Sequence, residues 1–294
     1  MPNTVTILPD QQRDVLLQRY AATVSRRRNV SIVVLAVLAA LTLLAAVMAE
    51  VRPQTFFANI GNFGGFLAKI LPPLSLSDLP GGLAEWYWGL GKWLGLLGDT
   101  ILTAYLGTLS GAIFAFLLCF LATSNLVQTN WLRFCAKRLL EFCRTVPDLV
   151  FALIFVIAFG LGPMAGVFAL AIHTTGALGK LFAEVVENID MKPVEGVSST
   201  GAPWHVAMRY GALPQVMSNF VSYTLLRFEI NVRESAVMGF VGAGGIGQDL
   251  IEAIRKFYYT DVSAILLLIL VTVAIIDTLT SRVRHQLIGR EERR

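Results

Sequence analysis

Charged residues are scarce in this chain. They make up 15% of its 294 residues, against 55% that are hydrophobic, whereas an ordinary soluble domain carries about 25% charged residues. Four windows contain no Asp, Glu, Lys or Arg: 29–49, 100–132, 149–179 and 262–276. A helix that crosses a bilayer needs about 20 apolar residues; the first two windows supply that length, and the last reaches it by including 277–280. This scarcity excludes an ordinary soluble protein and predicts a polytopic membrane protein.

Residues that commonly act as catalytic groups or metal ligands are also few. The three cysteines form neither a C-x-x-C pair nor an even set, so we expect thiols that are buried or face the membrane. The three histidines, at 173, 205 and 285, are too scattered for a metal site. No Walker A lysine loop and no cluster of nucleophile, base and metal ligands is visible. The chain is therefore predicted not to be an enzyme, and its net charge of +4 is too small to suggest nucleic-acid binding.

The N-terminal half begins with a polar segment, 1–29, whose arginines 26–28 stand beside the first apolar run. Basic residues flanking a span favour the cytoplasmic side, so we expect the N-terminus inside and a first helix over 30–49. Val47-x-Ala49 resembles a signal-peptidase site, but the run is longer than a typical signal peptide and starts late, which favours an uncleaved helix. Residues 50–98 are rich in Gly, Pro and aromatics. We expect them on the outer side of the membrane, with part of the segment forming a helix at the membrane interface.

The next apolar windows predict further spans. A second helix over 100–122 contains Gly107-x-x-x-Gly111, which lets two helices approach closely and is expected to serve packing within the chain. The window 149–179 would be about 46 Å long as one helix, too long for one untilted span and short for two. Because the Gly-Leu-Gly-Pro run at 160–163 interrupts it, we expect two helices, about 139–160 and 164–186.

Two more helices, over 214–241 and 262–281, complete a prediction of six spans. Both chain ends are basic, which requires an even number of spans if both lie in the cytoplasm. A four-span arrangement, which merges 149–179 and leaves 180–261 outside, is also even. Hydropathy does not exclude the four-span arrangement, because 214–241 holds four charged residues and could therefore lie outside the membrane.

The polar segment 188–213 lies between apolar runs and carries Pro193 and Pro203. We expect short helices in water, with a tight turn at Gly201. An amphipathic helix of this kind can lie in a groove of a soluble partner, here through apolar anchors at Val197, Trp204 and Met208. An ordinary loop between helices is the alternative.

The fifth predicted span places charged residues within the membrane, where they are costly and usually face a bundle interior or a water-filled path. Glu229 and Arg233 are four residues apart and can pair, while Arg227, Asn231 and Glu234 share one helix face. We hypothesise that Arg227 or Arg233 lines the path of an anion, because guanidinium can meet an oxyanion with paired hydrogen bonds, and that Asn231 adds a neutral donor. The alternative is an ion-pair network that only fixes packing. His173, Thr174 and Thr175 could also face such a path.

Five stretches resemble segments of a known protein family. The spacing of Glu195, Gly201 and Leu213-Pro214 resembles the cytoplasmic loop of ABC import permeases, E-A-A-x3-G-x9-I-x-L-P, although Gly211 stands where the family usually has isoleucine. The runs RFEINVRES and GFVGAGGIG follow it, and RTVPDLVFALIFV and GLGPMAGVFALAIHTTGALGK precede it. Together they resemble the phosphonate-import branch of these permeases, the PhnE family, over about 99–288.

The resemblance implies an all-α polytopic membrane protein with six transmembrane helices and the type I ABC importer permease (MetI-like) fold. The segments would be a cytoplasmic 1–29, a first helix and outer segment 30–98, a permease domain 99–288 and a tail 289–294. It implies the permease subunit of an ATP-driven importer for phosphonate or a related phosphorus oxyanion, such as phosphate or phosphite, in a bacterial inner membrane with both termini in the cytoplasm. The implied partners are a second copy of the chain, a cytoplasmic ATPase dimer that binds ATP and magnesium, a periplasmic or surface-anchored binding protein and membrane lipid; this chain itself would hold no cofactor.

The resemblance also assigns sites. A coupling loop, 187–214, would contact the ATPase, and a glycine-rich outer gate would close the path. The G-x-G-x-x-G at 242–247 spells a dinucleotide fingerprint, but no strand pattern precedes it. The residues so assigned are Glu195, Val197, Thr200, Gly201, Ala202 and Trp204 for coupling, and Gly242, Gly244, Gly245 and Gly247 for the gate.

Other functions stay open at this point. A permease for methionine or another small solute has the same architecture, and only the RFEINVR run argues against it. A secondary anion transporter would also carry buried charges, but it would lack a docking loop and work without ATP.

Overall fold

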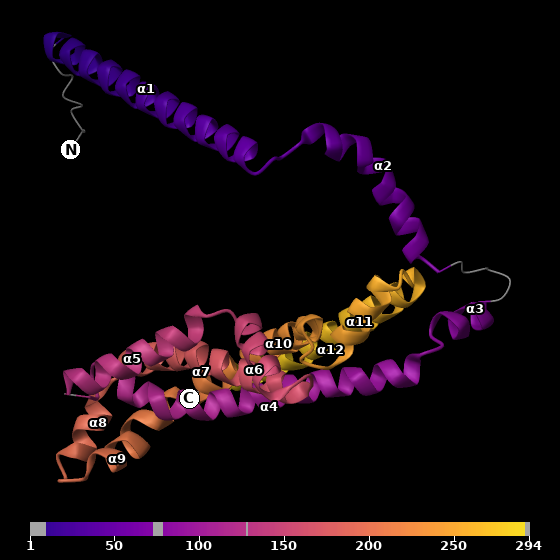
Figure 1. Ribbon diagram of the computed structural model, residues 1–294. Coiled ribbons are helices and arrows are strands. Elements are labelled where there is room, and N and C mark those ends of the chain that lie inside the picture. The colour runs from indigo at the N-terminus through magenta and orange to yellow at the C-terminus, as the bar shows by residue number, and fades with distance from the viewer. Residues whose placement is uncertain (1–9, 73–78, 128, 292–294) are drawn as a thin grey trace, which may run out of the picture. The chain divides into compact units, whose positions relative to one another are not determined.

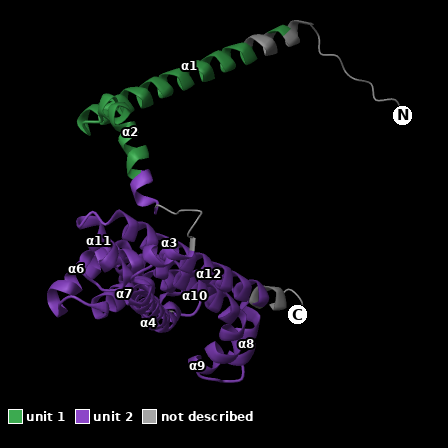
Figure 2. Ribbon diagram, turned by 90° about the vertical axis from the view of Figure 1, so that its right-hand side faces the viewer, with its two compact units in different colours: residues 1–66 green, residues 67–294 purple. Residues whose placement is uncertain are grey.

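The computed structural model describes residues 10–72, 79–127 and 129–291, and all regular structure in these ranges is helical (Figure 1). The chain divides into two compact units, 1–66 and 67–294 (Figure 2). The first unit holds α1 (Asp10–Met48) and most of α2 (Pro53–Ile70). Helix α1 begins well before the expected residue 30 because no glycine or proline interrupts 10–48. Its segment Arg19–Met48 is long and apolar enough to cross a membrane.

The second unit is a bundle whose long helices run side by side (Figure 1). Two groups of short elements lie at its opposite ends. One is the elbow, residues 188–212, and the other is the glycine loop, 242–247, with α11 after it. The elements in chain order are α3 (Leu79–Trp86), α4 (Leu90–Ala122), α5 (Asn130–Thr145), α6 (Asp148–Phe159), α7 (Pro163–Glu187), α8 (Met191–Ser198), α9 (Trp204–Ala207), the π turn η1 (Met208–Ala212), α10 (Leu213–Met238), the 3-10 turn η2 (Gly239–Val241), α11 (Ile246–Arg255) and α12 (Tyr259–Glu291).

Helices α4 and α7 pack closely through the two glycines singled out in the sequence. A Cβ atom on Gly107 would lie 2.6 Å from Leu170 Cβ, and one on Gly111 would lie 2.6 Å from Thr174 Cβ. No side chain fits at either position, so the small residues are what allows the two helices to touch. The expected packing within the chain is confirmed.

The segment expected as one helix over 139–160 is instead broken, so that prediction was wrong. Helix α5 ends at Thr145, α6 begins at Asp148, and the two are bent by 86°. Pro147 explains the bend, because proline donates no backbone hydrogen bond and disfavours the helical conformation at the residue before it.

Several helices in the described part of the chain are long and apolar enough to span a membrane. Among the described residues, α1, α4, α7 and α12 qualify by length and composition, and the bent pair α5–α6 makes a fifth. Helix α10 has 26 residues, about 39 Å, and falls outside that group because of its charged residues. The four-span arrangement fails, because α6 ends at Phe159 and α7 begins at Pro163. Glycines 160 and 162 have positive φ angles of 92° and 145° at that break.

Candidate functional site: elbow, charge cluster and glycine loop

The elbow presents most of the residues expected to contact a partner. Gly201 has a φ of 79° and turns the chain between α8 and α9, as the sequence predicted. Met208, expected as an exposed anchor, is instead 7% exposed in the hydrophobic core, so that part of the prediction was wrong. The coupling residues that face outward are Glu195, Thr200, Gly201 and Trp204, while Val197 and Ala202 are half-buried.

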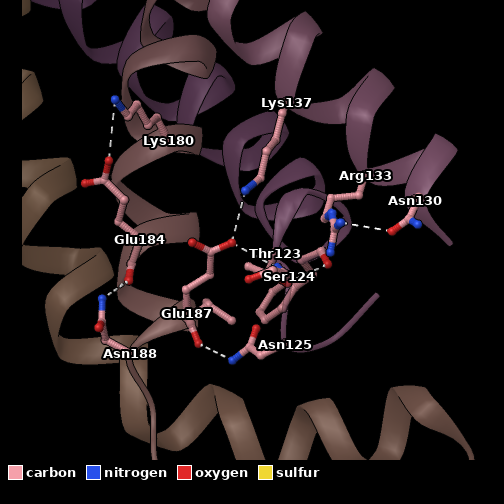
Figure 3. A network of polar contacts seen from close by, with 12 residues as sticks. Thr123, Ser124, Asn125, Asn130, Arg133, Lys137, Lys180, Glu184, Glu187 and Asn188 are labelled. Atoms are coloured by element: carbon pink, nitrogen blue, oxygen red, sulfur yellow. Dashed lines mark hydrogen bonds and ion pairs between the residues drawn. The ribbon is translucent and has the colours of Figure 1, made fainter. Parts of the chain in front are cut away.

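Polar contacts attach the end of α7, directly before the elbow, to α5 and to the turn between α4 and α5 (Figure 3). The Glu187 carboxylate accepts hydrogen bonds from the backbone N–H of Ser124, at 2.9 Å, and from Lys137 Nζ, at 3.1 Å. Asn125 Nδ2 donates to the Val186 carbonyl at 2.8 Å. These partners are at least fifty residues apart in the chain, so the sequence carried no signal for them.

Two further contacts act on the elbow itself. Trp204 Nε1 donates to the Leu126 carbonyl at 3.2 Å. Gln215 accepts from the Asp190 N–H at 3.1 Å and donates to the Asp190 carbonyl at 3.0 Å. The elbow is therefore held to α10 and to the turn between α4 and α5 by hydrogen bonds as well as through the chain.

Gly211 departs from the family pattern, and the packing beneath α8 gives the reason. A Cβ atom there would lie 2.7 Å from Val194 Cα, so α8 lies directly on the π turn. We expect Gly211→Ile to displace α8 and to destabilise the protein by about 1–3 kcal/mol through overpacking. Thermal unfolding of the purified permease measures this. Gly91→Ala is the control, because a Cβ atom on Gly91 meets nothing within 4 Å; equal melting temperatures for the two variants would contradict the prediction.

The charged residues of α10 form two separate pairs. Arg233 pairs with Glu229 one turn away, and Arg227 Nη2 donates to Glu234 Oε2 at 2.9 Å. Both pairings agree with the spacing in the sequence. Arg227 Nη2 also lies 3.1 Å from His173 Nδ1 of α7.

Asp148 completes this second group, which we call the charge cluster: Asp148, His173, Arg227 and Glu234. One ligand atom each from Asp148, His173 and Glu234 lies within 4.8 Å of the others, an arrangement that could hold a metal ion. The Arg227 guanidinium donates to one of these groups and contacts another, so a cation here would meet a fixed positive charge. The sequence did not single out Asp148, because helix α6 brings it to α7 and α10 only through the bend at Pro147.

Asn231, expected to add a donor to the path, links three helices. Its side chain is fully buried, and Nδ2 donates to Thr108 Oγ1 of α4 at 2.7 Å and to Thr174 Oγ1 of α7 at 2.9 Å. Both amide hydrogens are therefore committed. These contacts hold the polar helix α10 against α4 and α7 beside the charge cluster.

The glycine loop is a tightly packed turn at the end of α10. Gly242, Gly244 and Gly245 have φ angles of 85°, 81° and 77°, which side chains rarely adopt. The Gly162 N–H donates to the Gly242 carbonyl at 3.0 Å, and the Ile246 N–H donates to Thr100 Oγ1 at 2.9 Å. A helix and not a strand precedes the loop, so the dinucleotide fingerprint does not apply here. The glycines instead allow close packing between α4, α7 and α10.

Residues 119–290 match the family described as "Binding-protein-dependent transport system inner membrane component". The putative phosphite transport system permease HtxC of Stutzerimonas stutzeri is 33% identical over 275 residues, 92% of each chain. The phosphite permease PtxC of the same organism is 38% identical over 67% of this chain and 71% of its own. The putative cryptic phosphonate permease PhnE2 of Escherichia coli K12 is 52% identical over 41% of this chain and 98% of its own.

Solved structures share the fold. A chain of the inward-facing methionine ABC transporter MetNI has a TM-score of 0.57 at 18% identity, covering 66% of this chain and 95% of that one. A chain of a bacterial ABC transporter that imports alginate has a TM-score of 0.58 at 11% identity, covering 82% and 95%. At these identities the likeness establishes the architecture alone.

Proposed function

This chain belongs to the family of binding-protein-dependent transport system inner membrane components, within the phosphonate-import branch, and from that premise we propose that it carries a phosphorus oxyanion across the inner membrane. It is the membrane-spanning subunit of an ABC importer and has the type I permease fold. Phosphonate, phosphite and phosphate are the candidate substrates, because relatives of this chain are named as permeases for phosphite, phosphonate and, in Mycolicibacterium smegmatis, phosphate, and HtxC matches along 92% of its length.

The observation that carries the proposal is the elbow. It projects from one end of the bundle, and Glu195, Thr200 and Trp204 face outward from it. Short helices with an exposed mixed surface suit a groove on a soluble partner. We assign this partner as a cytoplasmic ATPase dimer that binds ATP and magnesium and presses on the elbow.

The remaining partners follow from the same proposal. Two copies of the chain would enclose the path, and a binding protein outside would deliver the anion at the end where the glycine loop lies. Gly242, Gly244, Gly245 and Gly247 would close that end until delivery. ATP binding would then switch the bundle between inward-facing and outward-facing arrangements, and both termini would lie in the cytoplasm.

Reconstituted transport tests this function. Proteoliposomes that contain the permease and its ATPase, supplied with the binding protein, are expected to take up labelled phosphite, methylphosphonate or phosphate only when ATP is present. The control is an ATPase whose Walker A lysine is replaced. Uptake driven by an ion gradient without ATP would indicate a secondary transporter, and uptake of methionine but no phosphorus oxyanion would overturn the substrate assignment.

A further inference from the structure

The charge cluster lies far from either end of the helices that supply its central members. Arg227 stands in the middle of α10, His173 stands in the middle of α7, and Asp148 is the first residue of α6 after the bend. The Arg227 and Glu234 side chains keep 12% and 27% of their surface exposed. An ionised group at this depth does not face lipid, because the desolvation cost is too high. The cluster therefore opens onto protein or onto a water-filled path.

Its guanidinium has donor capacity left over. Arg227 Nη2 is shared between Glu234 Oε2 and His173 Nδ1, while the Nε–H is buried and has no acceptor among the described residues. A buried donor without an acceptor is costly, so such a group normally meets water or a ligand. A phosphorus oxyanion offers several acceptor oxygens, and the planar guanidinium can bind two of them at once.

The second arginine of α10 is more exposed than Arg227. Arg233 pairs with Glu229 of its own helix, and half of its side-chain surface is exposed. Arg227 pairs with Glu234 of its own helix but also contacts His173 of α7, and both partners lie close to Asp148 of α6. A change in bundle arrangement would displace α6 and α7 relative to α10. These differences favour Arg227 over Arg233, the two candidates that the sequence left open for the anion path.

We propose that Arg227 is the transit site for the oxyanion, which takes over the guanidinium donors that Glu234 and His173 hold while the site is empty. This inference rests on the proposed function. Glu234 acts as a built-in competitor: it satisfies the arginine when no anion is present and keeps the anion from being trapped. Transport requires this balance, because a site on a path must bind well enough to admit its solute and weakly enough to release it.

Neutral variants distinguish a transit site from an ion pair that only holds helices together. In the reconstituted system, Arg227→Gln is expected to lower phosphite uptake at least about tenfold, as the loss of a charge-assisted oxyanion contact predicts, with unchanged co-purification of the ATPase. In the Arg227→Gln/Glu234→Gln double variant neither charge is left unpaired. If Arg227 and Glu234 only held the helices together, the double variant would regain uptake. If Arg227 is the transit site, the double variant remains inactive. Arg138→Gln, which removes an arginine from an exposed pair on α5, is the matched control and keeps wild-type uptake.

A binding measurement gives a second, independent readout. In this measurement, phosphite is added to the permease–ATPase complex without the binding protein. It is expected to raise the melting temperature of the Glu234→Gln complex at a several-fold lower phosphite concentration than the wild-type complex requires. The melting temperature of the Arg227→Gln complex is expected not to rise. Normal uptake by Arg227→Gln, or full recovery in the double variant, overturns the transit site while the proposed function stands. Should the wild type carry no phosphorus oxyanion at all, both the function and the site are overturned.

Discussion

Alanine at Gly247 is expected to leave little folded permease in the membrane. The added Cβ would lie 1.8 Å from the Ala236 carbonyl oxygen and 3.2 Å from Gly239 Cα. Both are backbone atoms at the end of α10, so no side-chain rotation relieves the clash. Overpacking ordinarily costs about 1–3 kcal/mol, and this contact lies at or beyond the upper end of that range. The yield of monodisperse protein after solubilisation, and its melting temperature, measure the effect.

Gly95→Ala serves as the control for this variant. Gly95 is exposed within α4, and a Cβ atom there meets nothing within 4 Å. Alanine in an open helical position is favoured over glycine by about 0.5–1 kcal/mol, so the control should be as stable as the wild type or slightly more stable. A Gly247→Ala protein with wild-type yield and melting temperature would show that the end of α10 and the glycine loop can separate, contrary to the packing described.

Reversing the charge at Glu195 is expected to release the ATPase from the permease. Glu195 is exposed on α8, and in the described part of the chain its side chain makes no hydrogen bond or ion pair, while its backbone carbonyl accepts from Ser199. Glu195→Lys should therefore fold normally. At the centre of an interface such a change typically costs about 2 kcal/mol or more, which is roughly a thirtyfold loss of affinity. Co-purification of the ATPase and ATP-dependent uptake should fall together.

The same reversal at Glu252 provides the comparison. Glu252 is an exposed residue of α11, at the end of the bundle opposite the elbow, where it pairs with Lys256. Glu252→Lys should co-purify with as much ATPase as the wild type. If Glu195→Lys retained the ATPase equally well, the elbow would not be the docking surface.

Much of the architecture could be predicted because local spacing determines it. Gly107 and Gly111 are four residues apart and fall on one helix face, so their role in packing followed from the sequence. The pair Arg233–Glu229 followed in the same way from the helical repeat, which also placed Arg227 and Glu234 on one helix face.

Contacts between distant segments could not be predicted. Asp148 reaches His173 and Glu234 only because Pro147 bends the chain, and the size of that bend depends on how α5 and α6 pack on α7. The polar segment around Met208 predicts an exposed anchor, but the π turn directs the Met208 side chain inward. Gly211 looked like a defect in a motif until the position of Val194 above it was known.

The polarity of α10 has a consequence for how this protein is made. Each charged residue at the centre of an inserting helix costs about 2.5–3.5 kcal/mol, and α10 carries four charged residues with a buried asparagine between them. Alone, it would be rejected by the lipid as it leaves the ribosome. Thr108 of α4 and Thr174 of α7 are synthesised earlier and supply the hydrogen-bond partners of Asn231. We therefore expect helix α10 to enter the bilayer by joining an α4–α7 pair that is already in place, which would make the order of synthesis part of the assembly pathway.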